Sequence, residues 1–281
     1  MEFEARKETA EIFKHVLRRQ IGNNFNVIRN TSDNDINLIA GTRTPTVEYI
    51  GTCDEILSTL CKGYGDHNIS HNTGNMLRWS SIFLNPRFVI FLLRECLIYE
   101  SLAKIVLLSE NFQDFFKYVQ HPQFDIAADA FSTFKDLLSR HKNIASQYLN
   151  NNFDAFFQKY NLLLQSDNFV TKLIALKLLN DLLHDRHNLS VMKKYVNNED
   201  NLKLIMNLLL ENTTATQLIA FNIFRIFLDN PKKADEVNRI LKDNKDLLIE
   251  FFQSSSNFNC DNDRFLDDKS SVVEQIKEIE Q

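Results

Sequence analysis

One apolar pattern recurs three times along the chain at a spacing of 45 residues. The segments at 125–138, 170–183 and 215–228 read DIAADAFSTFKDLL, VTKLIALKLLNDLL and ATQLIAFNIFRIFL, and they align without a gap. Their apolar columns lie at i, i+1, i+4, i+7 and i+8, which is one face of an α-helix. These columns are Ala130, Ala175 and Ala220; Phe131, Leu176 and Phe221; Phe134, Leu179 and Phe224; Leu137, Leu182 and Phe227; and Leu138, Leu183 and Leu228. The pattern predicts three copies of one amphipathic helix.

A second helix is predicted before each of these three. Its apolar columns, spaced by three and then four residues, are Phe112, Phe157 and Leu202; Phe115, Tyr160 and Ile205; and Val119, Leu164 and Leu209. Burial of one Leu or Phe side chain contributes about 1.5–3 kcal/mol, so these faces favour packing against a neighbouring repeat. Helical units of ~40–47 residues are typical of armadillo and HEAT repeats. We therefore predict an all-α armadillo/HEAT-type helical-repeat solenoid, in which each repeat contacts mainly its neighbours.

The composition argues against several other classes of protein. Only 6 Gly and 4 Pro occur in 281 residues, which disfavours a β-rich fold with many tight turns. The net charge of −5 disfavours nucleic-acid binding, which needs clustered Lys and Arg. The four cysteines form no CxxC motif and indicate reduced thiols in the cytosol. The first twenty residues read as a charged amphipathic helix rather than a signal peptide, and no apolar run reaches the ~18 residues of a membrane span. We expect a cytoplasmic protein.

The residues that could carry chemistry do not form a recognised site. His184 and His187 lie three residues apart, but no further metal ligand follows at a known spacing. An EF-hand loop counted from Asp261 would need Gly at its sixth position and Glu at its twelfth, where this chain has Leu266 and Val272. The chain also has no phosphate-binding glycine loop, GxSxG or HExxH motif. We therefore expect no enzymatic activity, no metal and no cofactor.

Several longer segments resemble a single family. They are LRRQIG (17–22), TRTPTVEYI (42–50), SLAKIVLLSE (101–110), FDIAADAFSTFKDLLSRHK (124–142), VTK (170–172), DRHN (185–188), NLKLIMNLL (201–209) and LIEFF (248–252). Together they resemble the calcium-binding protein thirty-nine family, also called the Mo-twenty-five scaffold proteins. The resemblance implies an armadillo-type scaffold that activates kinases without being an enzyme. Its expected partners are protein kinases and pseudokinases of the sterile-twenty class, in fungi within pathways of cell polarity and separation.

The same resemblance implies two binding surfaces. A concave face that cradles the kinase-like partner would include Phe124, Phe169, Lys177, Arg186 and Phe221. A pocket for the partner's C-terminal Trp-Glu-Phe tail would include Lys172, Lys203, Met206 and Gln217. The residues alone leave a second interpretation open, in which Met206 belongs to the core and the lysines are solvated.

This chain departs from the family pattern in the expected tail pocket. Leu173 and Asp243 replace an arginine and a lysine of the family, so both changes remove positive charge from a pocket for an acidic tail. The resemblance therefore supports docking of the kinase-like lobe more strongly than it supports binding of the tail.

Two segments interrupt the family pattern, at about 23–41 and 79–94. The second falls within a repeat helix, so we expect it to loop out or to break the first repeat. Our hypothesis is that both are translated introns; the alternative is a functional insertion. We expect a repeat domain over residues 1–252 that lacks the family's first helices, a polar linker at 253–266 and a final helix at 267–281.

Other helical-repeat proteins remain as rivals. The main alternative is a cargo or adaptor protein unrelated to kinases, such as one of the importin kind. Such adaptors line their groove with Trp and Asn, whereas the single tryptophan here, Trp79, lies in an interrupting segment. A helical repeat that reads RNA is disfavoured by the acidic balance.

Overall fold

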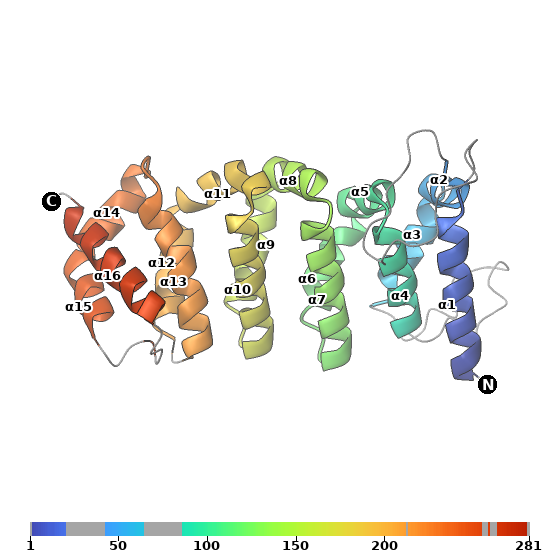
Figure 1. The fold of residues 1–281 in the computed structure, drawn as a ribbon, viewed down its shortest axis with the longest axis horizontal. Helices are drawn as coiled ribbons and strands as arrows, with labels where there is room; N and C mark the ends of the chain where they lie inside the picture. Colours follow the sequence, from blue (N-terminus) through green and yellow to red (C-terminus); the bar gives the residue numbers. More distant parts are fainter. Residues whose placement is uncertain are drawn as a thin grey trace. The chain divides into compact units, whose positions relative to one another are not determined.

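The computed structural model describes residues 2–20, 43–64, 86–211, 213–254, 258 and 263–279. These residues form sixteen α-helices and one short 3₁₀ helix, and no strand occurs among them (Figure 1). The predicted all-α helical-repeat fold is therefore confirmed. In the same residues, no helix is both long enough and apolar enough to cross a membrane.

The chain divides into two compact units, Met1–Ala145 and Ser146–Gln281. The first contains α1 (Glu2–Arg18), α2 (Pro45–Thr52), α3 (Asp54–Lys62), α4 (Pro86–Leu97), α5 (Glu100–Leu108), α6 (Asn111–Tyr118) and α7 (Phe124–Ser139). The division falls within α8 (Lys142–Asn151). The second contains α9 (Phe153–Leu164), α10 (Phe169–His184), η2 (Arg186–Asn188), α11 (Leu189–Val196), α12 (Glu199–Leu209), α13 (Thr214–Asp229), α14 (Asp235–Asp243), α15 (Lys245–Gln253) and α16 (Asp263–Glu278).

The predicted repeats correspond directly to helices. Helices α7, α10 and α13 each have 16 residues and begin at positions 124, 169 and 214, which preserves the spacing of 45. Every residue of the eight predicted apolar columns is at most 7% exposed. In the first unit α7 packs against α6 and α4, and in the second unit α10 and α13 pack against α9, α12 and each other. The apolar periodicity thus marks the faces that neighbouring helices cover.

Helix α4 differs from the expectation for the second interrupting segment. Residues 86–94 do not form a loop, because they make up most of α4, which begins at Pro86. Proline suits the first position of a helix, where its missing N–H removes no hydrogen bond. The helix buries Phe88, Val89, Leu92 and Leu93, and it packs against α1, α3, α5 and α7. Residues 23–41 and 79–85 lie outside the described part.

The C-terminal helix begins earlier than predicted, at Asp263 instead of 267. Helix α16 packs against α15 and α13. Arg225 of α13 forms an ion pair of 2.8 Å with Asp268 of α16, and Gln275 donates a hydrogen bond of 3.0 Å to Asp229. These contacts tie the final helix to the last of the three equivalent repeat helices.

Candidate functional site

Two phenylalanines are exposed at equivalent positions of successive repeats. Phe124 is the first residue of α7 and Phe169 is the first residue of α10, and their exposed fractions are 66% and 45%. Phe124 belongs to the first unit and Phe169 to the second. Large aromatic side chains are usually buried, and exposed ones gather at interaction surfaces. The sequence periodicity separates these two residues from the core columns, and the structure shows them at the surface.

A cap at the start of α10 fixes the backbone next to Phe169. The Asn168 Oδ1 accepts hydrogen bonds of 3.0 Å from the Val170 N–H and 3.2 Å from the Thr171 N–H. Thr171 is buried, which sets the rotation of this first turn. The aromatic side chain of Phe169 is therefore presented from a rigid helix end.

The other end of α10 presents a cation. Arg186 is exposed in the short helix η2. Beside it, the Asp185 carboxylate accepts from the His187 N–H at 2.9 Å, and Asn188 donates to the Leu182 carbonyl at 3.0 Å. These bonds hold the turn in place. Lys177, also predicted for the binding face, is exposed on α10 itself.

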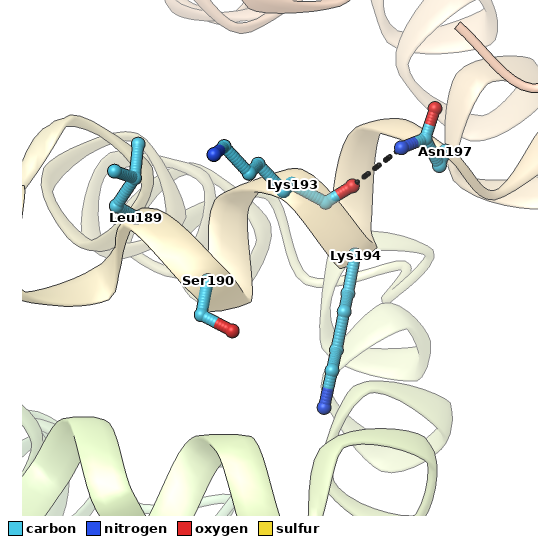
Figure 2. A pocket seen from close by; sticks show the side chains of 5 residues that line it. All are labelled: Leu189, Ser190, Lys193, Lys194 and Asn197. Carbon is cyan, nitrogen blue, oxygen red and sulfur yellow. Dashed lines mark hydrogen bonds between the residues drawn. The ribbon is translucent and has the colours of Figure 1, made fainter. Parts of the chain in front are cut away.

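Leu189 lies three residues after Arg186 and was not predicted from the sequence. Its side chain is 50% exposed, and it lines a surface hollow along α11 together with Ser190, Lys193, Lys194 and Asn197 (Figure 2). Leucine is a common residue, so its presence in the sequence does not by itself indicate an exposed binding site. The only available signal was its place directly after the DRHN motif.

A second hollow lies beside the first, over the turn between α8 and α9. It is lined by residues 150–155 and by Lys194, Asn197 and Asn198. Lys194 spans this region, since its Nζ donates to the Asn150 carbonyl at 3.1 Å and lies 5.6 Å from the centre of the Phe153 ring. None of the nine sequence-predicted site residues lines either hollow.

Two residues expected in the tail pocket each contact the chain around the turn between α12 and α13. The Lys172 Nζ lies 2.6 Å from a Glu211 carboxylate oxygen, and Gln217 donates to the Leu209 carbonyl at 3.3 Å. Both Lys172 and Glu211 are about half-buried. The charge of Lys172 is thus already balanced from within the chain.

The other cation expected in that pocket, Lys203, is paired along its own helix. Its Nζ lies 2.7 Å from Glu199 and 3.4 Å from Asp200, and the hydrogen bond to Glu199 raises its pKa. Met206, one turn further along α12, is half-buried. Leu173 is half-buried on α10, and Asp243 is exposed at the end of α14.

Phe221 cannot present its ring to a partner in this structure, because it is fully buried. It contacts the rings of Phe252, Phe258 and Phe265 at centroid distances of 5.7, 5.8 and 5.0 Å. Its assignment to the binding face is corrected by this burial. The ring belongs to the aromatic core that joins α13 to the two C-terminal helices.

The structure also shows where the possible metal ligands, His184 and His187, lie and what they contact. In the described part of the chain, no three His, Cys, Asp or Glu side chains come together in a group that could hold a metal ion. The His187 Nδ1 lies 2.7 Å from Asp185, and the His184 Nδ1 lies 2.9 Å from the Asn180 carbonyl. The two histidines thus have separate partners on α10 and at its C-terminal turn.

Comparison with known proteins gives a consistent result over nearly the whole chain. The profile of the family described as Mo25-like matches residues 1–85 and 88–280. A human calcium-binding protein 39-like protein is 42% identical over 279 residues, which cover 99% of this chain and 72% of that relative. MO25-like protein 2 of Caenorhabditis elegans is 42% identical with the same two coverages. A Mo25-like protein of Schizosaccharomyces pombe is 34% identical, over 99% of this chain and 74% of its own length. The chain therefore belongs to the Mo25-like family.

Proposed function

We propose that this chain is a non-catalytic cytoplasmic scaffold that binds, and thereby activates, protein kinases or pseudokinases of the sterile-twenty class. Its pathway would be signalling for cell polarity or growth. Membership of the Mo25-like family supports a scaffold role. The names of the relatives describe no chemical reaction, which agrees with a protein that acts by contact.

The observation that carries the proposal is the pair of exposed phenylalanines, Phe124 and Phe169. The core columns of the repeats are almost completely buried, whereas these two rings are 66% and 45% exposed. Aromatic and arginine side chains supply most of the binding energy at typical protein interfaces. Arg186 and Lys177 provide cations on the same helical repeat as Phe169. We assign the kinase-like partner to Phe169, Lys177 and Arg186 of the second unit, and Phe124 is a separate proposed contact in the first unit.

The partner's hydrophobic-acidic tail would make a second and weaker contact. Lys172, Lys203, Met206 and Gln217 are its proposed contacts. An acidic tail would have to compete with Glu211 for Lys172 and with Glu199 for Lys203. The neighbouring Leu173 and Asp243 add no positive charge. We therefore expect deletion of the partner's tail to weaken binding less than Arg186→Ala does.

Calorimetric titration with a purified sterile-twenty-class kinase domain from the same organism tests the proposal. We expect Phe169→Ala and Arg186→Ala each to weaken binding by about tenfold or more, because each removes an anchoring side chain. Leu162→Ala is the matched control, since Leu162 is 61% exposed on α9 but lies outside the proposed surface. Its affinity should stay within about twofold of the wild-type value.

The same titration can also contradict the proposal. Absence of binding by the wild-type chain to any kinase or pseudokinase of this class would reject it. Equal losses in Leu162→Ala and Phe169→Ala would reject the assigned surface. Recovery of transport cargo in place of kinases in a pull-down would support the adaptor alternative.

A further inference from the structure

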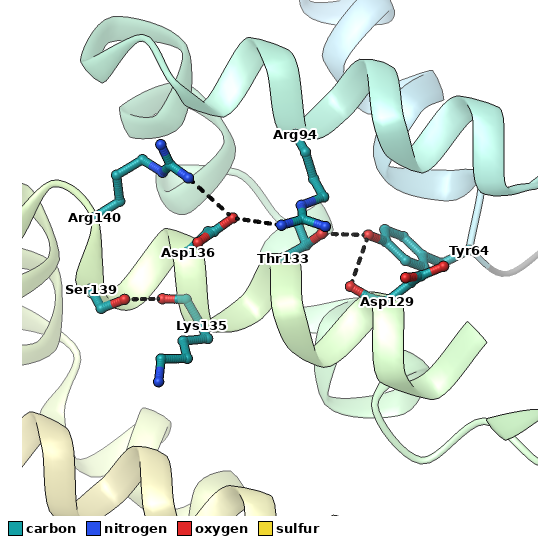
Figure 3. Close-up of polar contacts among 8 residues, drawn as sticks. All are labelled: Tyr64, Arg94, Asp129, Thr133, Lys135, Asp136, Ser139 and Arg140. Carbon is teal, nitrogen blue, oxygen red and sulfur yellow. Dashed lines mark hydrogen bonds and ion pairs between the residues drawn. The ribbon is translucent and has the colours of Figure 1, made fainter. Parts of the chain in front are cut away.

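The C-terminal ends of α4 and α7 bring two arginines to one carboxylate. Arg94 lies in the last turn of α4, and Asp136 and Arg140 lie at the end of α7. An Nη2 atom of each arginine is 3.5 Å from the same Asp136 oxygen, Oδ2 (Figure 3). The three side chains thus form a cluster with two positive charges and one negative charge. All three belong to the first compact unit.

Neighbouring contacts fix the two helix ends that carry this cluster. The His141 Nε2 lies 2.9 Å from the Leu97 carbonyl, which joins the end of α7 to the end of α4. One turn earlier on α7, Thr133 shares a hydrogen bond of 2.6 Å with the Tyr64 hydroxyl. Fixed positions reduce the entropy lost when a ligand is bound. The helix ends that carry the two arginines therefore have fixed positions before a ligand binds.

The guanidinium groups keep most of their hydrogen-bonding capacity. A guanidinium has five N–H donors, and strong charge-assisted bonds to carboxylates measure about 2.7–2.9 Å. Both contacts to Asp136 are longer, at 3.5 Å. The side chains of Arg94 and Arg140 are 42% and 38% exposed, whereas Asp136 is 22% exposed. Solvent, or a partner, can reach the arginines more easily than it can reach the carboxylate between them.

We propose that Arg94 and Arg140 together bind one Asp or Glu side chain of the partner protein. The cluster carries one excess positive charge, which a single carboxylate would balance. The sequence around it repeats, since Arg140-His141 follows α7 as Arg186-His187 follows α10, 46 residues later. Asp136 competes with the partner's carboxylate for the two guanidinium groups, and its two contacts of 3.5 Å are long enough to be replaced by shorter ones. The proposal rests on the proposed kinase-binding function.

The first test measures affinity for the kinase domain. Exposed ion pairs contribute modestly, so we expect Arg94→Gln and Arg140→Gln each to weaken binding by about two- to fivefold, with less effect at high salt. Asp136→Asn should tighten binding, because it removes the competing carboxylate. Lys135→Gln is the matched control, since Lys135 lies on the same helix and its side chain points away from Asp136 (Figure 3). Weaker binding by Asp136→Asn would overturn the proposal, because it would indicate a purely structural ion pair.

A second test does not depend on the kinase. The Nε–Hε signals of Arg94 and Arg140 can be followed by NMR while a short glutamate-rich peptide is added to the full chain. We expect both signals to shift together and to saturate, and we expect Arg140→Gln to abolish the shift at Arg94. Unchanged signals in the wild-type chain would overturn the site even if the kinase binds. Shifts without kinase binding would instead support the site and reject the proposed function.

Discussion

Two buried tyrosines of the second unit differ in how their hydroxyl groups are satisfied. Tyr160 and Tyr195 are both 0% exposed. The Tyr160 hydroxyl donates to the Ala175 carbonyl at 2.8 Å, whereas the Tyr195 hydroxyl has no hydrogen-bond partner among the described residues. A buried polar group without a partner costs roughly 1–3 kcal/mol of stability. The two hydroxyls therefore have opposite expected effects on folding.

Replacement of each tyrosine by phenylalanine tests this difference. We expect Tyr160→Phe to lower the free energy of unfolding by about 1 kcal/mol, because a hydrogen bond is lost. We expect Tyr195→Phe to leave it unchanged or to raise it by about 1 kcal/mol, because an unsatisfied hydroxyl is removed. Urea unfolding followed by circular dichroism gives both values. A loss in Tyr195→Phe as large as that in Tyr160→Phe would show that the Tyr195 hydroxyl is hydrogen-bonded in solution.

Single residues of the candidate site were predictable only where local spacing determines their environment. Phe124 and Phe169 lie outside the buried columns, so the repeat pattern already separated them from the core. Phe221 lies in a buried column, and its neighbours Phe252, Phe258 and Phe265 are distant in sequence. The pairing of Lys172 with Glu211 spans 39 residues. Periodicity along one helix contains no information about such tertiary contacts.

At the scale of the helix, α10 has a side-chain cap that α7 lacks. Asn168 caps α10, whereas Gln123 at the corresponding position before α7 makes no capping hydrogen bond. We expect Asn168→Ala to destabilise the fold by about 1 kcal/mol, because two helix N–H groups lose their acceptor. Gln123→Ala is the control and should have little effect. Hydrogen exchange at the Val170 and Thr171 amides measures the local part of the change. Unchanged exchange at both amides in Asn168→Ala would contradict the capping role.

Whole helices were more predictable than single contacts, because each depends on many residues at once. The three equivalent helices begin 45 residues apart, and the buried columns fall on their packed faces. Helix α4 was missed because comparison with the family pattern treated residues 79–94 as an interruption. Its own sequence has a favourable start at Pro86 and buries Val89, Leu92, Leu93 and Cys96 along one side. The local helix signals of this segment were therefore a better guide than its apparent interruption of the family motifs.

At the scale of the whole molecule, both units bury groups that lose a proton at alkaline pH. In the first unit, burial raises the pKa of Cys61 and of Cys96 to about 12, and it also raises the pKa of Tyr64. In the second unit, burial raises the pKa values of Tyr160 and Tyr195. A raised pKa means that the folded chain keeps a proton that the unfolded chain releases. The free energy of unfolding is therefore unaffected below the unfolded pKa values and must fall as the pH rises above them.

As the pH rises, the two thiols should be the first of these groups to lower the free energy of unfolding. Their pKa in the unfolded chain is about 9, which is lower than that of tyrosine. Each contributes up to about 1.4 kcal/mol per pH unit above that value, so we expect a loss of about 2–3 kcal/mol between pH 8 and pH 10. Urea unfolding under reducing conditions at several pH values measures this loss of stability.

Changing both Cys61 and Cys96 to Ala should flatten this pH dependence, even though the variant is less stable at neutral pH. Cys53→Ala is the control, since Cys53 is only half-buried. Stability that stays constant to pH 10 in the wild-type chain would show that the first unit is open to hydroxide, contrary to the packing of α3 against α4.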